Sequence, residues 1–358
     1  MIIIIGWINF FLQACDTLSE GRGKTEESLY DSGNLYHSIE YAQNDYCQRG
    51  QYREARKMIS RVESIISKLG GAEAWNKTNS LIWIQQRMHT RQLIEYFGDK
   101  TDSDFLRFTN RSLVPEPIPD GKMNYAAISE LGMLLEFVVK QTKICAKDKK
   151  NSCQSNKIIN WSLEESKKLQ ENLKKRKSTQ EYIKQTAWMF HQVMLGLKDL
   201  AEHVRPHGLK CFLQKNCKAR EEKLSDSIIN DIVTGPLQKA TEIQTKDMIQ
   251  SSVTVTLLYM PSWEVYGHVL LVFEKYQKAK EIFEASLERR MGRTLSLLGL
   301  ARAHAMLGNT EEADYFYQYL KIQLEQSDEV NPVFREANGW LKSRKALRED
   351  WFLPNYLP

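Results

Sequence analysis

Two consecutive stretches near the C-terminus share one pattern. The first is Trp263–Arg293, WEVYGHVLLVFEKYQKAKEIFEASLERRMGR, and the second is Thr294–Glu325, TLSLLGLARAHAMLGNTEEADYFYQYLKIQLE. Three pairs of small or aromatic residues recur at an interval of 34 positions: Gly267 and Ala301, Ala279 and Ala313, Phe283 and Tyr317. An interval of about 34 residues is typical of a repeated helix–turn–helix unit. The pattern therefore predicts two stacked pairs of helices.

Each recurring position has a physical role in such a pair. Two antiparallel helices approach closely where one of them carries a small side chain, and the recurring glycine and alanines supply it. Phe283 and Tyr317 then fill the groove between the helices. Gly308-Asn309 is suited to the turn of the second unit, because both residues tolerate left-handed backbone angles. The first unit turns at Glu274-Lys275-Tyr276, without a glycine.

These positions carry a family resemblance. With Trp263, Gly267, Tyr276, Ala279 and Phe283 where the motif has them, the chain resembles the tetratricopeptide repeat family, and within it a bacterial branch whose role is mostly unassigned. The resemblance implies an all-α fold of helix–turn–helix repeats stacked as an α-solenoid with a C-terminal capping helix. Members of this class bind protein or peptide ligands in a concave groove rather than catalyse reactions.

A similar unit lies near the N-terminus, over Tyr36–Ser67. Gly50 and Ala55 are five residues apart, the same offset as in the second C-terminal unit, and Ile59 takes the groove-filling position. Gly70-Gly71 is typical of a glycine cap that ends the second helix. The N-terminal unit is therefore predicted to be a further repeat.

The chain divides into an apolar segment 1–22, a divergent helical-repeat region 34–250 and a C-terminal region 260–358. Within the middle region, long loops are predicted near 98–121 and 145–160, and Gly235-Pro236 interrupts weaker helices. Its predicted helices are Lys77–Phe97 with the apolar stripe Leu81, Ile84, Met88 and Leu93, Tyr125–Thr142, a helix opened by the capping box Ser162/Glu165, and one from Ser178/Glu181 to about His203.

The C-terminal region contains the two units, a terminal helix and a tail. The helix is predicted over Phe334–Leu347, with Pro332 near its start and Trp340 turned inward. Trp351 and Phe352 are expected to fold back over it. This helix would cap the last repeat.

The segment 1–22 allows three interpretations. Its apolar run is about eleven residues long, whereas a membrane-spanning helix needs roughly 20. Gly6-Trp7 followed by an apolar and then polar stretch is consistent with the turn and second helix of another repeat. A signal peptide cleaved near Ala14 fits the length but lacks a preceding Lys or Arg. An ordinary buried helix is the third interpretation.

The cysteines leave the redox compartment open. The local pairs Cys145 with Cys153 and Cys211 with Cys217 would form loop-stapling disulfides in an exported protein. In a cytoplasmic protein, which is favoured over a secreted one without a firm signal, they would be free thiols.

The net charge of the chain does not indicate nucleic-acid binding. Lys and Arg exceed Asp and Glu by five over 358 residues, so nucleic-acid binding is unlikely. The basic stretch 165–184 includes Glu171 and Glu181 and has no aromatic residue before Tyr182, which favours a solvated helix face over a base-stacking surface. No transmembrane span is predicted.

Catalytic and metal-binding patterns are weak. His203, His207, Cys211 and Cys217 are zinc-ligand types, but Pro206 separates the histidines and the cysteine spacing is wide, so no metal site and no cofactor is predicted. Phosphate-binding glycine loops and the common hydrolase motifs are absent from the sequence. A zinc-binding or hydrolytic protein is the less favoured alternative.

The sequence therefore favours a non-catalytic protein- or peptide-binding scaffold, with an exported, disulfide-stapled helical protein as the alternative. Residues of the first helices that are not committed to packing should line the concave groove. The predicted groove residues are His37, Glu40, Asn44, Gln48, Glu264, His268, Arg302 and Met306. The identity of the ligand is not encoded in any recognisable pattern.

Overall fold

A computed structural model describes residues 33–71, 81, 84, 85, 88, 89, 91, 155–175, 181–204, 235–246, 261–328 and 331–344. The secondary structure of these residues is α-helical apart from short turns, and no strand is found among them. The helices are α3 (Gly33–Gln48), α4 (Tyr52–Lys68), α8 (Ser155–Lys175), α9 (Glu181–Val204), α13 (Gly235–Lys246), α15 (Ser262–Val272), α16 (Tyr276–Arg289), α17 (Thr294–Leu307), α18 (Thr310–Gln323) and α19 (Pro332–Ser343). The predicted all-α class is confirmed.

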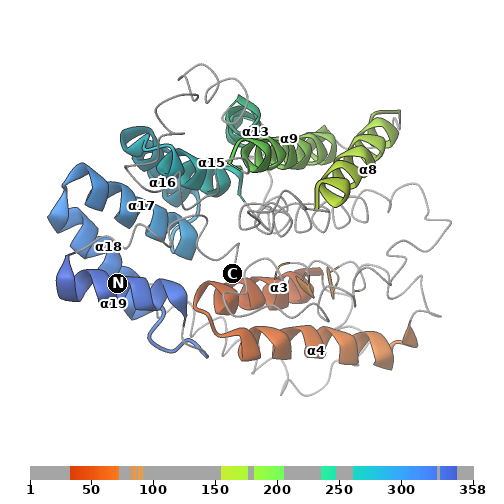
Figure 1. The fold of residues 1–358 in the computed structure, drawn as a ribbon. Helices are drawn as coiled ribbons and strands as arrows, with labels where there is room; N and C mark the ends of the chain where they lie inside the picture. Colours follow the sequence, from red (N-terminus) through yellow and green to blue (C-terminus); the bar gives the residue numbers. More distant parts are fainter. Residues whose placement is uncertain are drawn as a thin grey trace.

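Helices that follow one another in sequence pack against one another. From α15 to α19, each helix contacts the next, and α15 also contacts α17. On its other side α15 meets α13 and α9, and α9 contacts α8 (Figure 1). None of the helices in the described part of the chain is long and apolar enough to cross a membrane.

The turns of the two C-terminal units lie where the sequence predicts them. Gly308 ends α17 in the left-handed region at φ 81°, where glycine carries no steric penalty. Glu274 takes the corresponding position after α15 at φ 59°, which is costly for a residue with a Cβ. A tight turn therefore forms in both units, and only one of them uses a glycine.

Phe283 is the centre of packing between the two units. Its ring is fully buried, and the chain carries a glycine on each neighbouring helix where the ring arrives. A Cβ at Gly267 of α15 would lie 2.5 Å from Phe283 Cζ, and one at Gly299 of α17 would lie 2.1 Å from it. Both helices therefore need glycine at this level. The sequence pattern identified Gly267, whereas the role of Gly299 became visible only in three dimensions.

The terminal helix has the predicted features. Asn331 caps α19 by accepting a hydrogen bond from the Val333 amide at 2.9 Å, and Pro332 occupies the first turn. Trp340 is buried, as expected, and its Nε1–H donates to Asp314 at 2.8 Å. The helix ends at Ser343, four residues before the predicted Leu347.

The middle region differs from the prediction at the start of one helix. α8 begins at Ser155, so Ser162 lies inside the helix rather than at its cap, and the last part of the predicted loop 145–160 is helical. α13 begins at Gly235-Pro236, where the sequence predicts a break, because proline is well accommodated in a first helical turn, where no amide partner is needed. The residues directly before Gly235 lie outside the described part of the chain. α9 begins at Glu181, and its predicted cap residue Ser178 lies outside the described residues.

Several other predictions fall wholly or partly outside the described residues. The described positions of 77–97 are helical, and Leu81, Ile84 and Met88 are buried as the stripe predicts. The segment 1–22, the loop 98–121, the helix 125–142, the paired cysteines and the C-terminal tail lie outside them. Among the described residues the only cysteine is Cys47, which is buried.

Candidate functional site

The first helices of the C-terminal units are enclosed rather than exposed. Every residue of α15 is buried, and so is every residue of α17 from Thr294 to His304. The prediction that Glu264, His268 and Arg302 are uncommitted residues lining a groove is therefore wrong. They lie inside the protein: α15, which carries Glu264 and His268, also contacts α9 and α13, and Arg302 of α17 pairs with Glu336 of α19.

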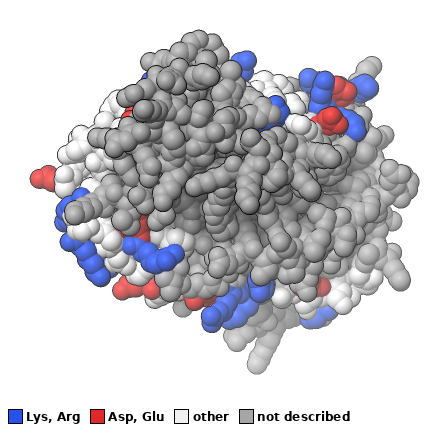
Figure 2. All heavy atoms as spheres, in the orientation of Figure 1, with Lys and Arg blue, Asp and Glu red and all other residues white. Residues whose placement is uncertain are grey.

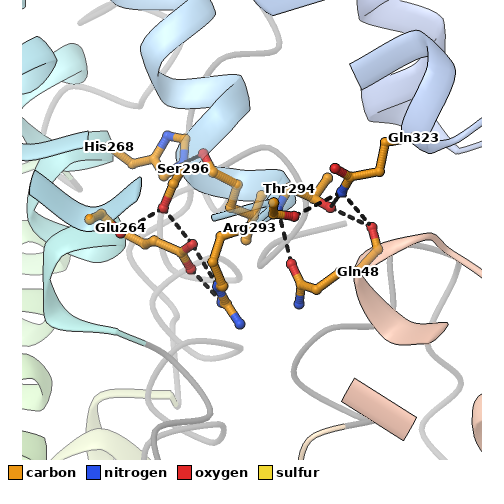
Figure 3. A network of polar contacts seen from close by, with 10 residues as sticks. Gln48, Glu264, His268, Arg293, Thr294, Ser296 and Gln323 are labelled. Atoms are coloured by element: carbon orange, nitrogen blue, oxygen red, sulfur yellow. Dashed lines mark hydrogen bonds and ion pairs between the residues drawn. The ribbon is translucent and has the colours of Figure 1, made fainter. Parts of the chain in front are cut away.

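The carboxylate of Glu264 forms a buried ion pair with Arg293, the residue directly before α17. Its two carboxylate oxygens accept from Arg293, Oε1 from Nε at 2.9 Å and Oε2 from Nη2 at 2.6 Å, and Oε1 also accepts from Ser296 Oγ at 2.7 Å (Figure 3). Ser296 in turn lies 2.8 Å from Ser286 Oγ on α16. A bidentate carboxylate–guanidinium pair with a third donor is well compensated for its loss of hydration. The group holds the start of α17 against α15.

His268 is a neutral residue of the interior. Its Nε2 donates to the Leu295 carbonyl oxygen at 3.1 Å, since that oxygen only accepts, and its ring meets the edge of Phe283 at a centroid distance of 5.0 Å. Burial, with a smaller contribution from the Arg302 charge, lowers the pKa of His268 to about 3. The imidazole is therefore uncharged at neutral pH and its position gives no route for substrate.

A second buried ion pair joins α17 to α19. Arg302 Nε donates to Glu336 Oε1 at 2.7 Å, Nη2 pairs with Oε2, and the Tyr317 hydroxyl donates to Oε1 at 2.9 Å. Burial and the adjacent Glu336 carboxylate raise the pKa of Tyr317 well above its usual range. Tyr317 also stacks on Trp340 at 5.4 Å. The aromatic position that packs on glycine in the first unit thus carries a hydrogen-bonding hydroxyl in the second.

Glu336 could have been found from the repeat interval. His268, Arg302 and Glu336 follow one another at intervals of 34 residues and lie on α15, α17 and α19. The sequence analysis identified the first two and stopped before the third. Arg293 lies in a turn between units, and no repeated pattern indicates it.

The N-terminal helix pair contacts the C-terminal units. The Thr294 amide donates to Gln48 Oε1 at 3.0 Å, and Gln323 Nε2 donates to the Gln48 carbonyl oxygen at 3.1 Å (Figure 3). The Asp328 amide donates to the Gly50 carbonyl oxygen at 3.1 Å. Gln48 is therefore buried in a contact between segments some 246 residues apart, and the prediction that it lines a groove is wrong.

The other predicted groove residues differ in how far they are buried. Glu40 is buried and pairs with Arg91 at 3.3 Å, so its predicted exposure is also wrong. Asn44 and Met306 are half-buried, and His37 lies on α3 with its side chain outside the described residues. The structure therefore brings Glu264, His268 and Arg302 together in the interior, while Glu40 joins a separate cluster.

A serine and a histidine approach each other between α8 and α9. Ser166 Oγ lies 2.6 Å from His191 Nδ1 and 2.8 Å from the Leu163 carbonyl oxygen of its own helix. Burial lowers the pKa of His191, with the charges of Lys167 and Lys174 acting in the same direction. Ser166 is fully buried in the middle of a helix, where no ester or amide could reach it. The geometry is that of a helix–helix contact.

Metal ligands do not gather in the part of the chain that the structure describes. Within it, no group of three His, Cys, Asp or Glu side chains could hold an ion. The histidine and cysteine cluster 203–217 lies outside that part, except for the backbone of His203 at the end of α9.

One exposed surface stands out from the rest. Tyr315, Tyr319 and Ile322, which are 63%, 40% and 55% exposed, follow one another at intervals of four and three residues on α18. Met291, 81% exposed, precedes Gly292, whose carbonyl oxygen accepts from Gln323 Nε2 at 2.9 Å near the C-terminal end of α18. We call these four side chains the α18 strip. Exposed carboxylates bound it at both ends: Glu311, Glu312 and Glu325.

Comparison with known proteins found no match. No model of a known protein family matches the chain, and no curated protein and no solved structure is similar to it.

Proposed function

We propose that this chain is a non-catalytic helical-repeat scaffold that binds a protein or peptide ligand. The repeat arrangement that we propose is tetratricopeptide-like, with α15–α16 and α17–α18 as stacked units and α19 as the cap. It is supported by the common register of the two helix pairs and by the buried aromatic residue at the same place in each, Phe283 and Tyr317.

The observation that carries the binding function is the α18 strip. Single exposed apolar residues are common on protein surfaces, whereas a contiguous group is a feature of interaction sites. Four of the five large apolar side chains exposed in the described residues belong to this strip. Tyrosine contributes much contact area at a low cost in side-chain entropy, which favours it in binding surfaces.

The site proposed here differs from the concave groove usual for stacked helix pairs. The charged side chains of the first helices are buried in ion pairs, Glu264 with Arg293 and Arg302 with Glu336, so they are not presented to a ligand. The outer face of a second helix, α18, carries the unsatisfied apolar area instead. A ligand would therefore bind on the side of the repeat that faces away from the enclosed helices.

Peptide selection tests this function directly. Random displayed peptides would be selected on the intact chain, and the affinities of the enriched peptides measured by calorimetry. We expect the triple variant Tyr315→Ala/Tyr319→Ala/Ile322→Ala to bind them at least about tenfold more weakly, since each truncated contact residue at a binding centre costs on the order of 1 kcal/mol or more.

The matched control is Tyr41→Ala, which removes an exposed tyrosine that stands apart from the strip on α3. It should leave the affinities unchanged. Equal affinity of the selected peptides for the wild type and the triple variant would refute the α18 site.

A further inference from the structure

The outer face of α4 carries four cations from Arg53 to Arg61 and a fifth, Lys68, at its end. Its inner face is apolar and buried, through Tyr52, Ala55, Ile59, Val62 and Ile65. The cationic and hydroxyl side chains outside that face are exposed, except for the half-buried Arg61, and the exposed Glu63 is interspersed with them: Arg53, Arg56, Lys57, Ser60, Arg61, Ser64, Ser67 and Lys68. At 1.5 Å per residue the row is roughly 22 Å long. Figure 2 shows Lys and Arg side chains along the lower edge of the molecule, where Figure 1 places α4.

The carboxylates of this region leave the middle of the row positive. Glu54 accepts from Lys57 Nζ at 2.6 Å, which also raises the pKa of Lys57. Glu63 is turned to the neighbouring helical segment, where it accepts from Gln85 at 3.0 Å and lies 3.3 Å from His89. Of the cations, Arg56 and Arg61 have no carboxylate partner among the residues that the structure describes.

The carboxylate of Asp328 lies at the N-terminal end of α4. Its Oδ2 accepts from the backbone amide of Arg53 at 2.5 Å, at the N-terminus of α4, where a carboxylate meets the positive end of the helix dipole. This carboxylate oxygen therefore accepts from the backbone at the start of the helix. The remaining row runs from Arg56 to Lys68, away from Asp328.

We propose that this basic face of α4 binds an acidic segment of a partner protein. Arg53, Lys57 and Arg61 follow one another at intervals of four residues, so their charges recur about every 6 Å, once per helical turn. Carboxylates one turn apart on an acidic helix have the same spacing. Arginine pairs with a carboxylate through two parallel hydrogen bonds, and the serine hydroxyls between the arginines can donate to further oxygens.

Two other anionic partners fit this face less well. Single-stranded nucleic acid is usually held by aromatic side chains stacked on its bases, and the one aromatic residue of α4, Tyr52, is buried. A helix that lies on an anionic membrane inserts apolar side chains beside its basic ones, and the outward row named above contains no apolar residue. Carboxylates require neither feature, so the acidic segment is the partner that the surface favours.

Fluorescence anisotropy with the intact chain tests the proposal. The probe is a fluorescein-labelled helical peptide with Glu at every fourth position and Ala elsewhere, measured at low salt. The variant Arg56→Glu/Arg61→Glu should weaken binding about tenfold or more, since it turns two attractions into repulsions. Raising the salt to about 1 M should abolish binding, because the Debye length falls to roughly 3 Å.

The matched control is Lys167→Glu/Lys168→Glu, which makes the same change of net charge on exposed residues of α8. Its affinity should remain within a factor of about two of the wild type. The neutral variant Arg56→Gln/Arg61→Gln, checked for its unfolding transition, should show an intermediate loss and keeps the test valid if charge reversal prevents folding.

Four results would overturn the proposal: no binding of the probe at low salt, equal binding of a peptide with Gln in place of Glu, equal weakening by the α4 and α8 variants, or tighter binding of oligo-dT or phosphatidylserine vesicles than of the peptide. Loss of the α18 strip leaves this experiment unaffected, because the two surfaces use different residues. The two proposals can therefore fail separately.

Discussion

Adding one methyl group at Gly299 should destabilise the protein through its contact with Phe283. In Gly299→Ala the new Cβ would lie 2.1 Å from Cζ and 2.4 Å from both Cε atoms of the ring, whereas ordinary contacts begin near 3.4 Å. The ring cannot retreat freely, because its tip also meets Gly267 on the other side. One helix or the ring must therefore move by more than 1 Å.

Two effects of opposite sign decide how much Gly299→Ala changes the free energy of unfolding. Alanine is favoured over glycine in a helix by roughly 1 kcal/mol. Overpacking of a well-filled core typically costs about 1–3 kcal/mol, and this overlap is at the severe end because both neighbours are constrained. We therefore expect Gly299→Ala to lower the free energy of unfolding by about 2 kcal/mol, which corresponds to a fall in Tm of several degrees for a chain of this size.

A double-mutant cycle identifies the cause. Unfolding by denaturant would be followed by circular dichroism for the wild type, Gly299→Ala, Phe283→Leu and the double variant. In the Phe283→Leu background the alanine should be neutral or stabilising, since the clash is removed and the helix propensity remains. If Gly299→Ala is as stable as the wild type, or if its cost is the same in both backgrounds, the packing of Phe283 between α15 and α17 is wrong.

Three further predictions concern the buried polar groups. Glu336→Gln should lower the free energy of unfolding by about 3–5 kcal/mol, because it leaves the buried Arg302 guanidinium without its counter-charge. The double variant Arg302→Met/Glu336→Leu should lower it less in the same denaturant assay. A larger loss in the double variant would contradict this reasoning. The folded pKa of His268, about 3, lies below its unfolded value near 6.5, so protons favour the unfolded state and stability contributed by this residue is lost as the pH falls from about 6.5 to 3. The wild type should therefore lose about 1.4 kcal/mol per pH unit more than His268→Phe between pH 6 and 4, and equal slopes would refute the assignment. Gln48→Ala/Gln323→Ala should speed amide hydrogen exchange in α3 and α4 more than in α15 to α17, as mass spectrometry would show; a uniform change along the chain would mean that the junction is not a separate contact.

Local sequence signals predicted most of the C-terminal helices. The 34-residue recurrence placed α15 to α18, and Pro332 marked the start of α19. These signals succeed because small residues, turn residues and caps act on their near neighbours in the chain. The start of α8 was missed, since Ser162 has the sequence of a cap but lies in a helix that already extends over the preceding residues.

The predicted binding residues failed for a different reason. Helical periodicity shows which residues share a face, but not whether another part of the chain covers that face. Glu264 and Arg302 were predicted to line a groove because they lie on first helices and are not among the recurring packing residues. Their partners, Arg293 and Glu336, are 29 and 34 residues away, so burial and pairing are established together by the packing of α17 on α15 and α19.

The sequence alone determined that this protein is helical, where its C-terminal units turn, and which small and aromatic residues repeat within them. Only the tertiary structure decided that α15 and α17 are enclosed, that Gln48 meets Thr294 across 246 residues, and that the outward apolar and basic rows lie on α18 and α4. The physical reason is that a helix forms through bonds between residues four positions apart, whereas exposure is a property of everything that packs around it.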